Sequence, residues 1–319
     1  MPDMNVRRID EISKNDVGIA GGKGASLGEM TRTGIPVPPG FVLLATAFDR
    51  FLEETDLTQE VQAQLAQVNY EDIASVERAS QVIHDLILSA TMPTDIADEI
   101  VQAHETLGAE FMAVRSSATA EDSSVASWAG ELETYLNTTE DKVIENIKRC
   151  WASLFTPRAI VYRNKKGMLD TRVSVAVVIQ KMVQSEVSGI TFTVHPVTED
   201  RNQMVVEAAW GLGEMIVGGY VTPDSYVVNK RDGSLIDVNV SEQMEMMIRS
   251  AEGNTRVPVS EKNKSIQKLS IEQISEISTI CQKIETHYSF PCDIEWAMEG
   301  GHFYIVQSRP ITTLKTKTL

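Results

Sequence analysis

Residues 21–30 read GGKGASLGEM. Near the other end of the chain, residues 293–296 read DIEW and residues 307–310 read QSRP. The first stretch offers a lysine within pliable backbone, which suits phosphate groups. The other two offer oxygen ligands for a divalent cation and the fixed positive charge of an arginine. Together they predict a nucleotide site assembled from distant parts of one fold.

The glycine-rich stretch is a weak signal when it is taken alone. A P-loop has Ser or Thr after its Gly-Lys pair, whereas Gly24 follows Lys23. Gly22 and Gly24 fit a dinucleotide-binding fingerprint, but Gly28 comes one residue late. A strand-to-helix turn with a surface lysine is an equally good interpretation of this stretch.

A second motif, VRSSATAED at residues 114–122, places Arg115 beside three hydroxyls. Hydroxyls and successive backbone N–H groups form a nest for phosphate oxygens, and a guanidinium can bind two oxygens at once. We interpret Arg115 and Ser116 as phosphate-binding, with an ordinary polar loop as the alternative. The irregular residues 126–134, which end at Thr134, are expected to form a lid that excludes water.

Two shorter motifs could serve the rest of a nucleotide. A strand end with exposed backbone can read the edge of an adenine, and the candidates are Gln180, Lys181, Met182 and Val183. In WGLGE, residues 210–214, the glycines allow close approach of a ligand, and Glu214 could bind ribose hydroxyls. Taken alone, plain sheet and a tight turn are the better interpretations.

The C-terminal stretches predict a hairpin that carries the hard oxygen donors preferred by Mg²⁺: Asp293, Glu295 and Gln307. A two-residue turn at Gly300-Gly301 would pair Glu295 with position 306 and turn Gln307 to the other face. We therefore predict an odd-length connection, residues 300–302, which puts Glu295 opposite Gln307 and Arg309 on the same face. A solvated sheet face is the alternative.

Composition narrows the class of protein. The chain has 319 residues and a formal net charge of −16. Such a charge disfavours nucleic acid and anionic membranes as partners. No apolar run reaches the roughly 18 residues of a membrane span, and the N-terminus lacks a signal-peptide pattern. The three cysteines lack metal-ligand spacing. We expect a cytoplasmic protein with reduced thiols.

The periodicity predicts an α+β fold, with a helical N-terminal third followed by mainly antiparallel sheet. Asp232-Gly233 predicts a hairpin turn. A long helix is expected after a cap formed by Ser270 and Gln273, with its buried side at Ile274, Ile277, Cys281, Ile284 and Tyr288. We assign residues 1–185 to a subdomain with the phosphate-binding residues and the lid, and residues 186–319 to one with the metal-binding hairpin.

Taken in order, residues 21–30, 114–122, 210–214 and 293–310 resemble the N-terminal nucleotide-binding domain of phosphoenolpyruvate synthase and pyruvate phosphate dikinase. Rifampicin phosphotransferase shares that domain. The resemblance runs from about Ile9 to Thr312. It implies an ATP-grasp fold and the use of ATP and Mg²⁺.

The resemblance also implies a role for each candidate residue. Phosphate binding and stabilisation of the transferring phosphate fall to Lys23, Arg115 and Arg309, with Ser116 beside them and Thr134 in the lid. Adenine meets Gln180, Lys181, Met182 and Val183, and the ribose meets Glu214. The metal is bound by Glu295 and Gln307.

In that family, ATP phosphorylates a carrier histidine and is converted to AMP and phosphate. The carrier then phosphorylates pyruvate or a drug hydroxyl. The histidines of this chain do not lie in the Gly-Gly…Ser-His context of that carrier: His84, His104, His195, His287 and His302. We therefore expect the carrier and acceptor domains in further sequence or in a partner subunit. A regulatory nucleotide-binding subunit and a ligase-type enzyme that releases ADP are the alternatives.

Overall fold

The computed structural model describes residues 4–119, 133–168, 173–250 and 253–314. The chain divides into two compact units. The first contains Met1–Glu29 and Pro39–Met182, and the second contains Met30–Pro38 and Val183–Leu319. A single boundary after residue 185 therefore does not describe the division, because Met30–Pro38 belongs with the later residues. One of the contacts that hold this segment is a hydrogen bond of 2.7 Å from the Ile305 amide to the Pro36 carbonyl.

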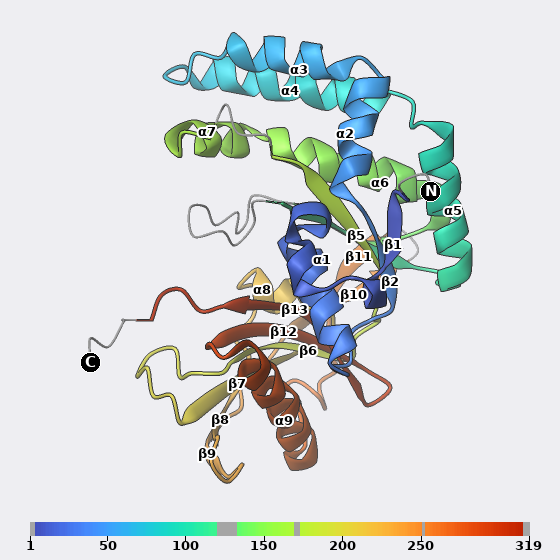
Figure 1. Ribbon diagram of the computed structural model, residues 1–319. Coiled ribbons are helices and arrows are strands. Elements are labelled where there is room, and N and C mark those ends of the chain that lie inside the picture. The colour runs from blue at the N-terminus through green and yellow to red at the C-terminus, as the bar shows by residue number, and fades with distance from the viewer. Residues whose placement is uncertain (1–3, 120–132, 169–172, 251–252, 315–319) are drawn as a thin grey trace. The chain divides into compact units, whose positions relative to one another are not determined.

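The first unit is built on a five-stranded antiparallel sheet in the order β1-β2-β5-β3-β4 (Figure 1). Its strands are β1 (Val6–Arg8), β2 (Gly40–Leu43), β3 (Met112–Ala118), β4 (Thr134–Thr138) and β5 (Val175–Lys181). Valine and isoleucine dominate the central strand β5, which is buried along nearly its whole length. Such residues favour a strand that is covered on both faces.

Helices cover one face of this sheet. Those that lie against the strands are α2 (Ala45–Glu54), α5 (Thr94–Leu107) and α6 (Glu140–Ala152). A further layer, α3 (Leu57–Ala66), α4 (Ile73–Ser89) and α7 (Pro157–Lys165), packs on these helices, and the 3-10 turn η3 (Ser153–Phe155) connects α6 to α7. Trp151 of α6 is fully buried, with its ring 4.9 Å from Phe51 and 5.5 Å from Phe48. The aromatic cluster joins α2 to α6, and burial of such rings is a main source of stability.

The opposite face of the same sheet is covered by α1 (Val17–Arg32), which follows the 3-10 turns η1 (Ile9–Glu11) and η2 (Lys14–Asp16). At Gly24 the helix lies against the β2 side chain Val42: a Cβ there would be 3.6 Å from it. Side chains alternate between the faces of a strand, so the residues that meet α1 are the odd positions of β3 and the even positions of β5.

The second unit contains a six-stranded antiparallel sheet in the order β13-β12-β6-β7-β8-β9. Its strands are β6 (Val187–Phe192), β7 (Gln203–Trp210), β8 (Asp224–Asn229), β9 (Leu235–Asn239), β12 (Cys292–Glu299) and β13 (His302–Pro310). A separate hairpin consists of β10 (Glu245–Ser250) and β11 (Gly253–Pro258). The turn between β8 and β9 contains Gly233 with a φ of 72°, as the Asp-Gly pair predicts.

Two helices complete the second unit: the short α8 (Glu214–Val217) and the long α9 (Ile271–Tyr288). Ser270 and Gln273 form the expected capping box of α9. The predicted apolar side of α9 is buried except at its last residue, Tyr288, which is half-buried at the end of the helix. Figure 1 shows the helix lying across one face of the sheet. The α+β fold class is thus confirmed, with antiparallel pairing in both sheets. No helix in the described part of the chain is long and apolar enough to cross a membrane.

Candidate nucleotide site

A sharp kink in α1 gives the glycine-rich stretch its shape. Gly21 has φ 69° and ψ 174°, outside the helical range. The Ser117 hydroxyl of β3 donates a hydrogen bond to the Ala20 carbonyl (2.9 Å) and accepts one from the Gly24 amide (3.1 Å). One side chain thus fixes both sides of the kink, and the backbone that carries Lys23 is anchored to β3.

The same face of this sheet gathers three further candidate residues. Arg115 of β3 pairs with Thr134 of β4 and with Val178 of β5, and Gln180 lies two residues beyond Val178. Directly paired residues, and residues two apart along a strand, point to the same face. Arg115, Thr134 and Gln180 therefore share the face on which α1 lies. Arg115 is only 8% exposed, so its charge is poorly screened by water.

Lys23 also acts electrostatically on the interior of this unit. Burial strongly raises the pKa of the Cys150 thiol, and the Lys23 ammonium is a charge that acts in the opposite direction. Cys150 lies under β3, with its sulfur 3.8 Å from the Val114 carbonyl. Lys23 thus acts on a thiol that contacts β3, and β3 is also the strand that carries Arg115.

Ser116 differs from its two neighbours. It lies on the other face of β3 from Arg115, is fully buried, and donates its hydroxyl to the Glu133 carbonyl at 2.9 Å. The structure therefore does not bring Ser116 together with Arg115. The hydroxyl that meets the glycine-rich stretch is that of Ser117, because strand alternation places residues 115 and 117 on one face. Residues 120–122 of the motif and residues 126–132 of the expected lid lie outside the described residues, whereas Thr134, the last residue of the expected lid, begins β4.

The expected adenine-binding segment ends β5. The Lys181 and Met182 amides donate hydrogen bonds to the Pro39 and Phe111 carbonyls, both at 2.9 Å. Lys181 is exposed, whereas Gln180, Met182 and Val183 are buried, and Val183 belongs to the second unit. These two amides are therefore engaged within the first unit, which leaves the carbonyls and side chains of the segment to be tested as base contacts.

In the second unit, β12 and β13 form the predicted hairpin with Glu295 opposite Gln307. The Gln307 amide nitrogen lies 3.5 Å from a Glu295 oxygen. Arg309 is opposite Asp293, two residues further along the same face, and its Nε donates to the Asp293 carboxylate at 2.9 Å. The pairing of Glu295 with Gln307 is thus confirmed.

The predicted odd-length connection is wrong. Glu299 pairs with His302, so the turn has only two residues, Gly300 and Gly301, both with positive φ. This is the backbone that a type I′ hairpin turn requires. The register changes instead within β13: Trp296 pairs with Ile305 but Glu295 with Gln307, which leaves Val306 as an extra, bulged residue. The bulge restores the parity that the short turn removes.

One acidic residue, Glu207, joins the metal-ligand candidates Asp293, Glu295 and Gln307. Asp293 Oδ1 is buried and has no hydrogen-bond partner among the described residues. Glu207 of β7 lies on the same face, since Ile190 of β6 pairs with both Glu295 and Glu207. Burial, and then the charge of Asp293, raise the pKa of Glu207. Alternation along the strands could have indicated Glu207, which the sequence motifs did not.

This donor set fits Mg²⁺. Carboxylate and amide oxygens are its usual protein ligands, and the buried Asp293 Oδ1 is available for one more contact. Among the described residues no three His, Cys, Asp or Glu side chains converge as a complete cage. Mg²⁺ bound with ATP does not need such a cage, because it keeps water ligands and takes oxygens from the phosphates.

The expected ribose-binding turn, residues 210–214, is held by side chains from the region of β10 and β11. The buried Gln243 accepts from the Trp210 amide (2.8 Å) and donates to the Trp210 carbonyl (3.1 Å). Glu214 accepts a hydrogen bond of 2.7 Å from Asn254. The Glu214 carboxylate is therefore oriented by a neighbouring amide before any ligand is present.

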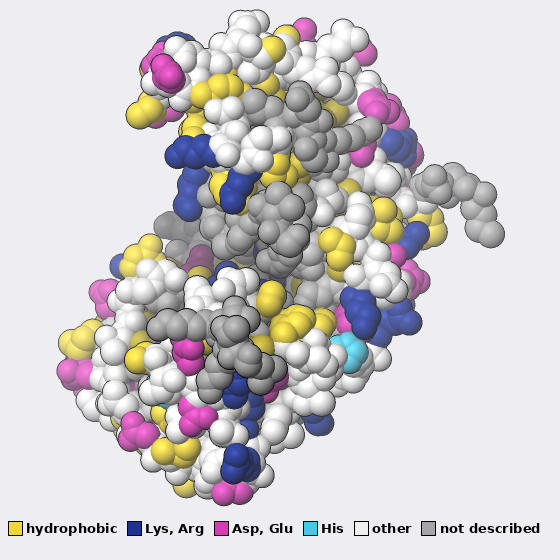
Figure 2. Space-filling model, turned by 60° about the vertical axis from the view of Figure 1, so that its left-hand side comes forward, with side chains coloured by type: hydrophobic (Ala, Val, Ile, Leu, Met, Phe, Trp, Pro, Cys, Tyr) yellow, Lys and Arg dark blue, Asp and Glu magenta, His cyan; other side chains and the backbone are white. Residues whose placement is uncertain are grey.

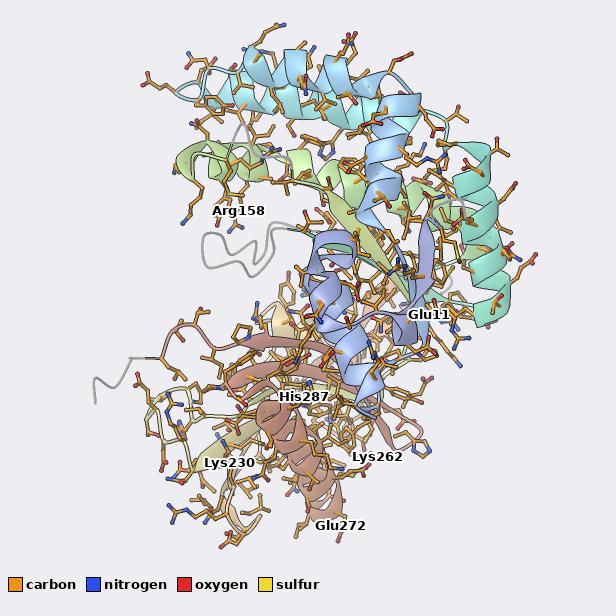
Figure 3. The ribbon with its side chains drawn as sticks, viewed as in Figure 1. Glu11, Arg158, Lys230, Lys262, Glu272 and His287 are labelled. Atoms are coloured by element: carbon orange, nitrogen blue, oxygen red, sulfur yellow. The ribbon has the colours of Figure 1, made fainter. Side chains whose placement is uncertain are left out.

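Three of the histidines, His104, His195 and His287, make contacts of an ordinary structural kind. The His104 Nε2 lies 3.0 Å from the Ala109 carbonyl, and the His195 Nδ1 lies 3.2 Å from the Val197 amide. His287 lies near the end of α9, with its ring edge-on to Tyr288 (Figure 3). These contacts give no sign of a histidine prepared as a phosphoryl acceptor.

The α+β fold combines a glycine-rich stretch anchored by Ser117, a sheet face that carries Arg115, and a hairpin lined by oxygen ligands. These features define the chain as a nucleotide-binding domain. A family model described as "Pyruvate phosphate dikinase, AMP/ATP-binding domain" matches residues 17–319. The chain belongs to this family, which confirms the resemblance seen in its motifs.

Curated relatives carry related names. The chain is 45% identical over 315 residues to the "Probable phosphoenolpyruvate synthase" of Methanocaldococcus jannaschii, covering 96% of this chain and 26% of the relative. It is 43% identical to the "Phosphoenolpyruvate synthase" of Pyrococcus furiosus, covering 97% and 44%. It is 38% identical to the "Rifampicin phosphotransferase" of Bacillus subtilis, covering 96% and 36%. The chain thus spans less than half the length of each of these relatives.

Among solved structures, a chain from Pyrococcus horikoshii matches 76% of this chain with a TM-score of 0.31 at 14% sequence identity. Its full length is covered. A similarity this low carries no argument about fold or function.

Proposed function

We propose that the chain binds ATP with Mg²⁺ and phosphorylates a histidine on a carrier domain, converting ATP to AMP and phosphate. In this proposal the phosphoryl group finally reaches pyruvate, as in a phosphoenolpyruvate synthase. Family membership supports the use of ATP. The phosphoenolpyruvate synthase relatives from Methanocaldococcus jannaschii and Pyrococcus furiosus are 45% and 43% identical to the chain, against 38% for the rifampicin phosphotransferase, which favours pyruvate over a drug as the final acceptor.

The observation that carries the proposal is the anchoring of the glycine-rich stretch to β3 by Ser117. It fixes the backbone of Lys23 to the strand that holds Arg115. Two positive charges on fixed backbone reduce the reorganisation needed to bind a triphosphate, which is the main protein contribution to phosphoryl transfer. Thr134 and Gln180 add polar groups on the same sheet face.

In the second unit, Asp293, Glu295 and Gln307 would hold the metal. When bound, Mg²⁺ neutralises phosphate oxygens and orients them for transfer. Arg309, which is 41% exposed while it pairs with Asp293, would exchange part of that contact for the transferring phosphate. Glu214 would accept hydrogen bonds from the ribose. The nucleophile would be an imidazole supplied from outside the described residues, so this chain needs no general base of its own.

The test measures transfer of radioactive phosphate from [β-³²P]ATP to a histidine carrier domain taken from a curated relative, together with AMP formation. We expect Lys23→Met, Arg115→Met and Arg309→Met each to slow transfer by about 30- to 1,000-fold, since one charge-assisted phosphate contact is worth roughly 2–4 kcal/mol in the transition state.

Lys14→Met is the matched control, because Lys14 is an exposed lysine that forms an ion pair of 3.7 Å with Glu29. It should transfer phosphate at the wild-type rate. Wild-type rates in all three site variants would refute the assignment. ATP binding without AMP formation would instead support a regulatory subunit, and ADP as the product would support a ligase-type enzyme.

A further inference from the structure

The hairpin of β10 and β11 is joined to the turn at residues 210–214. One edge of β10 pairs with β11, and its other edge meets the turn, where the Leu212 amide donates a hydrogen bond of 2.9 Å to the Met247 carbonyl. Gln243, just before β10, binds both backbone groups of Trp210. The hairpin and the turn are therefore linked through their backbones within the second unit.

The hairpin also places an amide on the carboxylate at the end of this turn. Asn254 of β11 donates a hydrogen bond of 2.7 Å from Nδ2 to Oε2 of Glu214, the first residue of α8, and both residues are half-buried. Two residues further along β11, the Arg256 guanidinium lies 4.1 Å from the centre of the Tyr220 ring, just beyond α8. Two side chains of β11 thus contact the segment that begins at Glu214.

The contact with Asn254 leaves Glu214 able to bind hydroxyl groups. An ionised carboxylate has about four lone-pair sites, and the Asn254 amide occupies one of them. Figure 2 shows acidic side chains scattered over the surface, so charge alone does not distinguish Glu214. Its fixed orientation does, because a ligand that reaches it need not immobilise this side chain again.

We propose that Asn254 is a positioning residue that sets the preference of the nucleotide site for ribose over 2′-deoxyribose. It does so by holding the Glu214 carboxylate in the orientation that accepts the ribose hydroxyls. The inference rests on the proposed function, in which Glu214 meets the ribose. It adds a specificity role for the β10–β11 hairpin, which carries none of the candidate phosphate or metal residues.

Isothermal titration of the full chain with ATP and with 2′-deoxyATP, both in the presence of Mg²⁺, tests the inference. The ratio of the two Kd values isolates the ribose, because the base and the triphosphate are the same in both probes. The wild type should bind ATP about 10- to 100-fold more tightly than 2′-deoxyATP, the range expected for a hydrogen bond to a charged group. Glu214→Ala should bind both probes nearly equally.

Asn254→Ala should reduce the preference for ATP by at least about fivefold, because the Glu214 carboxylate is then free to rotate. Asn254→Asp, which is nearly equal in shape, should abolish it, because two adjacent carboxylates repel each other. A residue that acts through Glu214 has no effect without it. Asn254→Ala should therefore weaken ATP binding in the wild-type background and leave it unchanged in Glu214→Ala.

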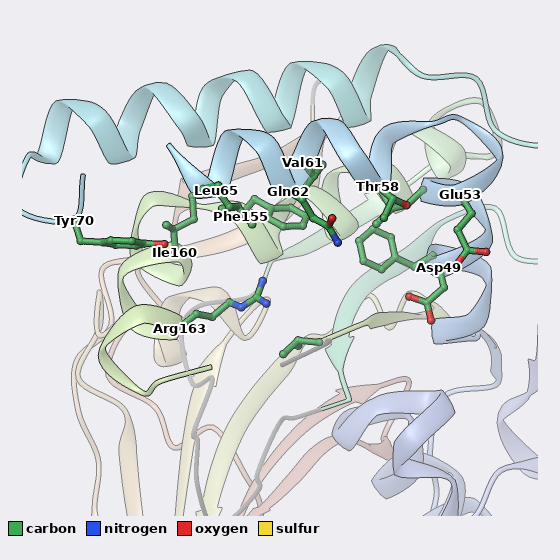
Figure 4. A pocket seen from close by; sticks show the side chains of 14 residues that line it. Asp49, Glu53, Thr58, Val61, Gln62, Leu65, Tyr70, Phe155, Ile160 and Arg163 are labelled. Atoms are coloured by element: carbon green, nitrogen blue, oxygen red, sulfur yellow. The ribbon is translucent and has the colours of Figure 1, made fainter. Parts of the chain in front are cut away.

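Two controls separate this role from general effects on the fold. Asn239→Asp makes the same chemical change at an exposed asparagine of β9 in the same unit, and it should bind both probes like the wild type. Val61→Ala truncates a buried side chain in the wall of a cavity of about 650 Å³ in the first unit (Figure 4). It should lower the melting temperature without changing the ratio of the two Kd values.

Three results would overturn the inference and leave ATP binding intact. The wild type could bind the two probes equally, a folded Asn254→Asp could keep the full preference, or Asn254→Ala could weaken ATP binding as much in Glu214→Ala as in the wild type. A wild-type chain that binds no ATP would instead refute the proposed function, and the inference with it.

Discussion

Ser117 shows how much one residue can decide. Its hydroxyl has one proton and two lone pairs, so it donates to the Ala20 carbonyl while it accepts from the Gly24 amide. Arginine could not replace it, and alanine would leave both backbone groups without this partner. The sequence shows a run of hydroxyls after Arg115. Only the alternation of side chains along β3 tells which of them, Ser117 rather than Ser116, faces the glycine-rich stretch.

Gly21 is a residue whose replacement should be damaging. A Cβ at this position would lie 2.2 Å from the Ser117 hydroxyl and 2.3 Å from its carbonyl oxygen, and the positive φ adds backbone strain. We expect Gly21→Ala to lower the free energy of unfolding by about 2–4 kcal/mol and to weaken ATP binding. Denaturant titration and calorimetry measure the two effects.

Gly18→Ala is the matched control in the same helix, since a Cβ there meets nothing within 4 Å. It should stabilise the chain by up to about 1 kcal/mol, because alanine is the better helix former. Equal stabilities of the two variants would show that the kink at Gly21 does not depend on glycine.

The C-terminal hairpin shows where sequence reasoning succeeds and where it fails at the scale of an element. The pairing of Glu295 with Gln307, the strands and the cap of α9 agree with the predictions made from local patterns. The bulge does not, because several registers bury Phe303 and Ile305 equally well, and only the packing of β13 on β12 selects one. The kink at Gly21 cannot be predicted from the local sequence for a similar reason, because it depends on contacts with β3, which is far away in the sequence.

The register of β13 yields a prediction. If Val306 is deleted, Gln307 follows Ile305 directly and still falls opposite Glu295, now without a bulge. We expect this variant to keep Mg²⁺-dependent ATP binding within about tenfold of the wild type. Inserting a second valine after Val306 shifts the alternation and should abolish the dependence on Mg²⁺.

Equilibrium binding of ATP with and without Mg²⁺ measures both variants, and circular dichroism checks that each is folded. The assignment of the metal site to this hairpin would be contradicted if a folded insertion variant kept the full Mg²⁺ dependence.

At the scale of the whole molecule, both units have dense interiors that contain a thiol. Cys150 of the first unit, and Cys281 and Cys292 of the second, are all 0% exposed. Burial raises the pKa of Cys281 and of Cys292 to about 12, and it raises that of Cys150 as well. The thiolate is the reactive form, so these side chains are protected by burial and by protonation.

We expect the folded chain to react with a disulfide reagent at pH 8 at less than about 1% of the rate of a free thiol, and to show three thiols in denaturant. Since folding raises these pKa values, the thiols contribute stability that is complete below their unfolded pKa of about 8.5 and is lost as pH rises above it. The melting temperature should therefore fall in alkaline buffer.

Ser275→Cys supplies the positive control, because position 275 lies on the exposed side of the same helix as Cys281. Its added thiol should react at the rate of a free thiol. Comparable rates for the native thiols would mean that these interiors open readily to solvent.

The path of the chain also limits how the protein can be dissected. Because residues 30–38 lie with the second unit while both flanking segments lie with the first, no single cut yields two intact halves. A fragment that starts at Val183 would lose Pro36, the acceptor for the Ile305 amide at the heart of β13. Libraries of truncated chains should therefore yield soluble C-terminal fragments only when residues 30–38 are added back to the fragment.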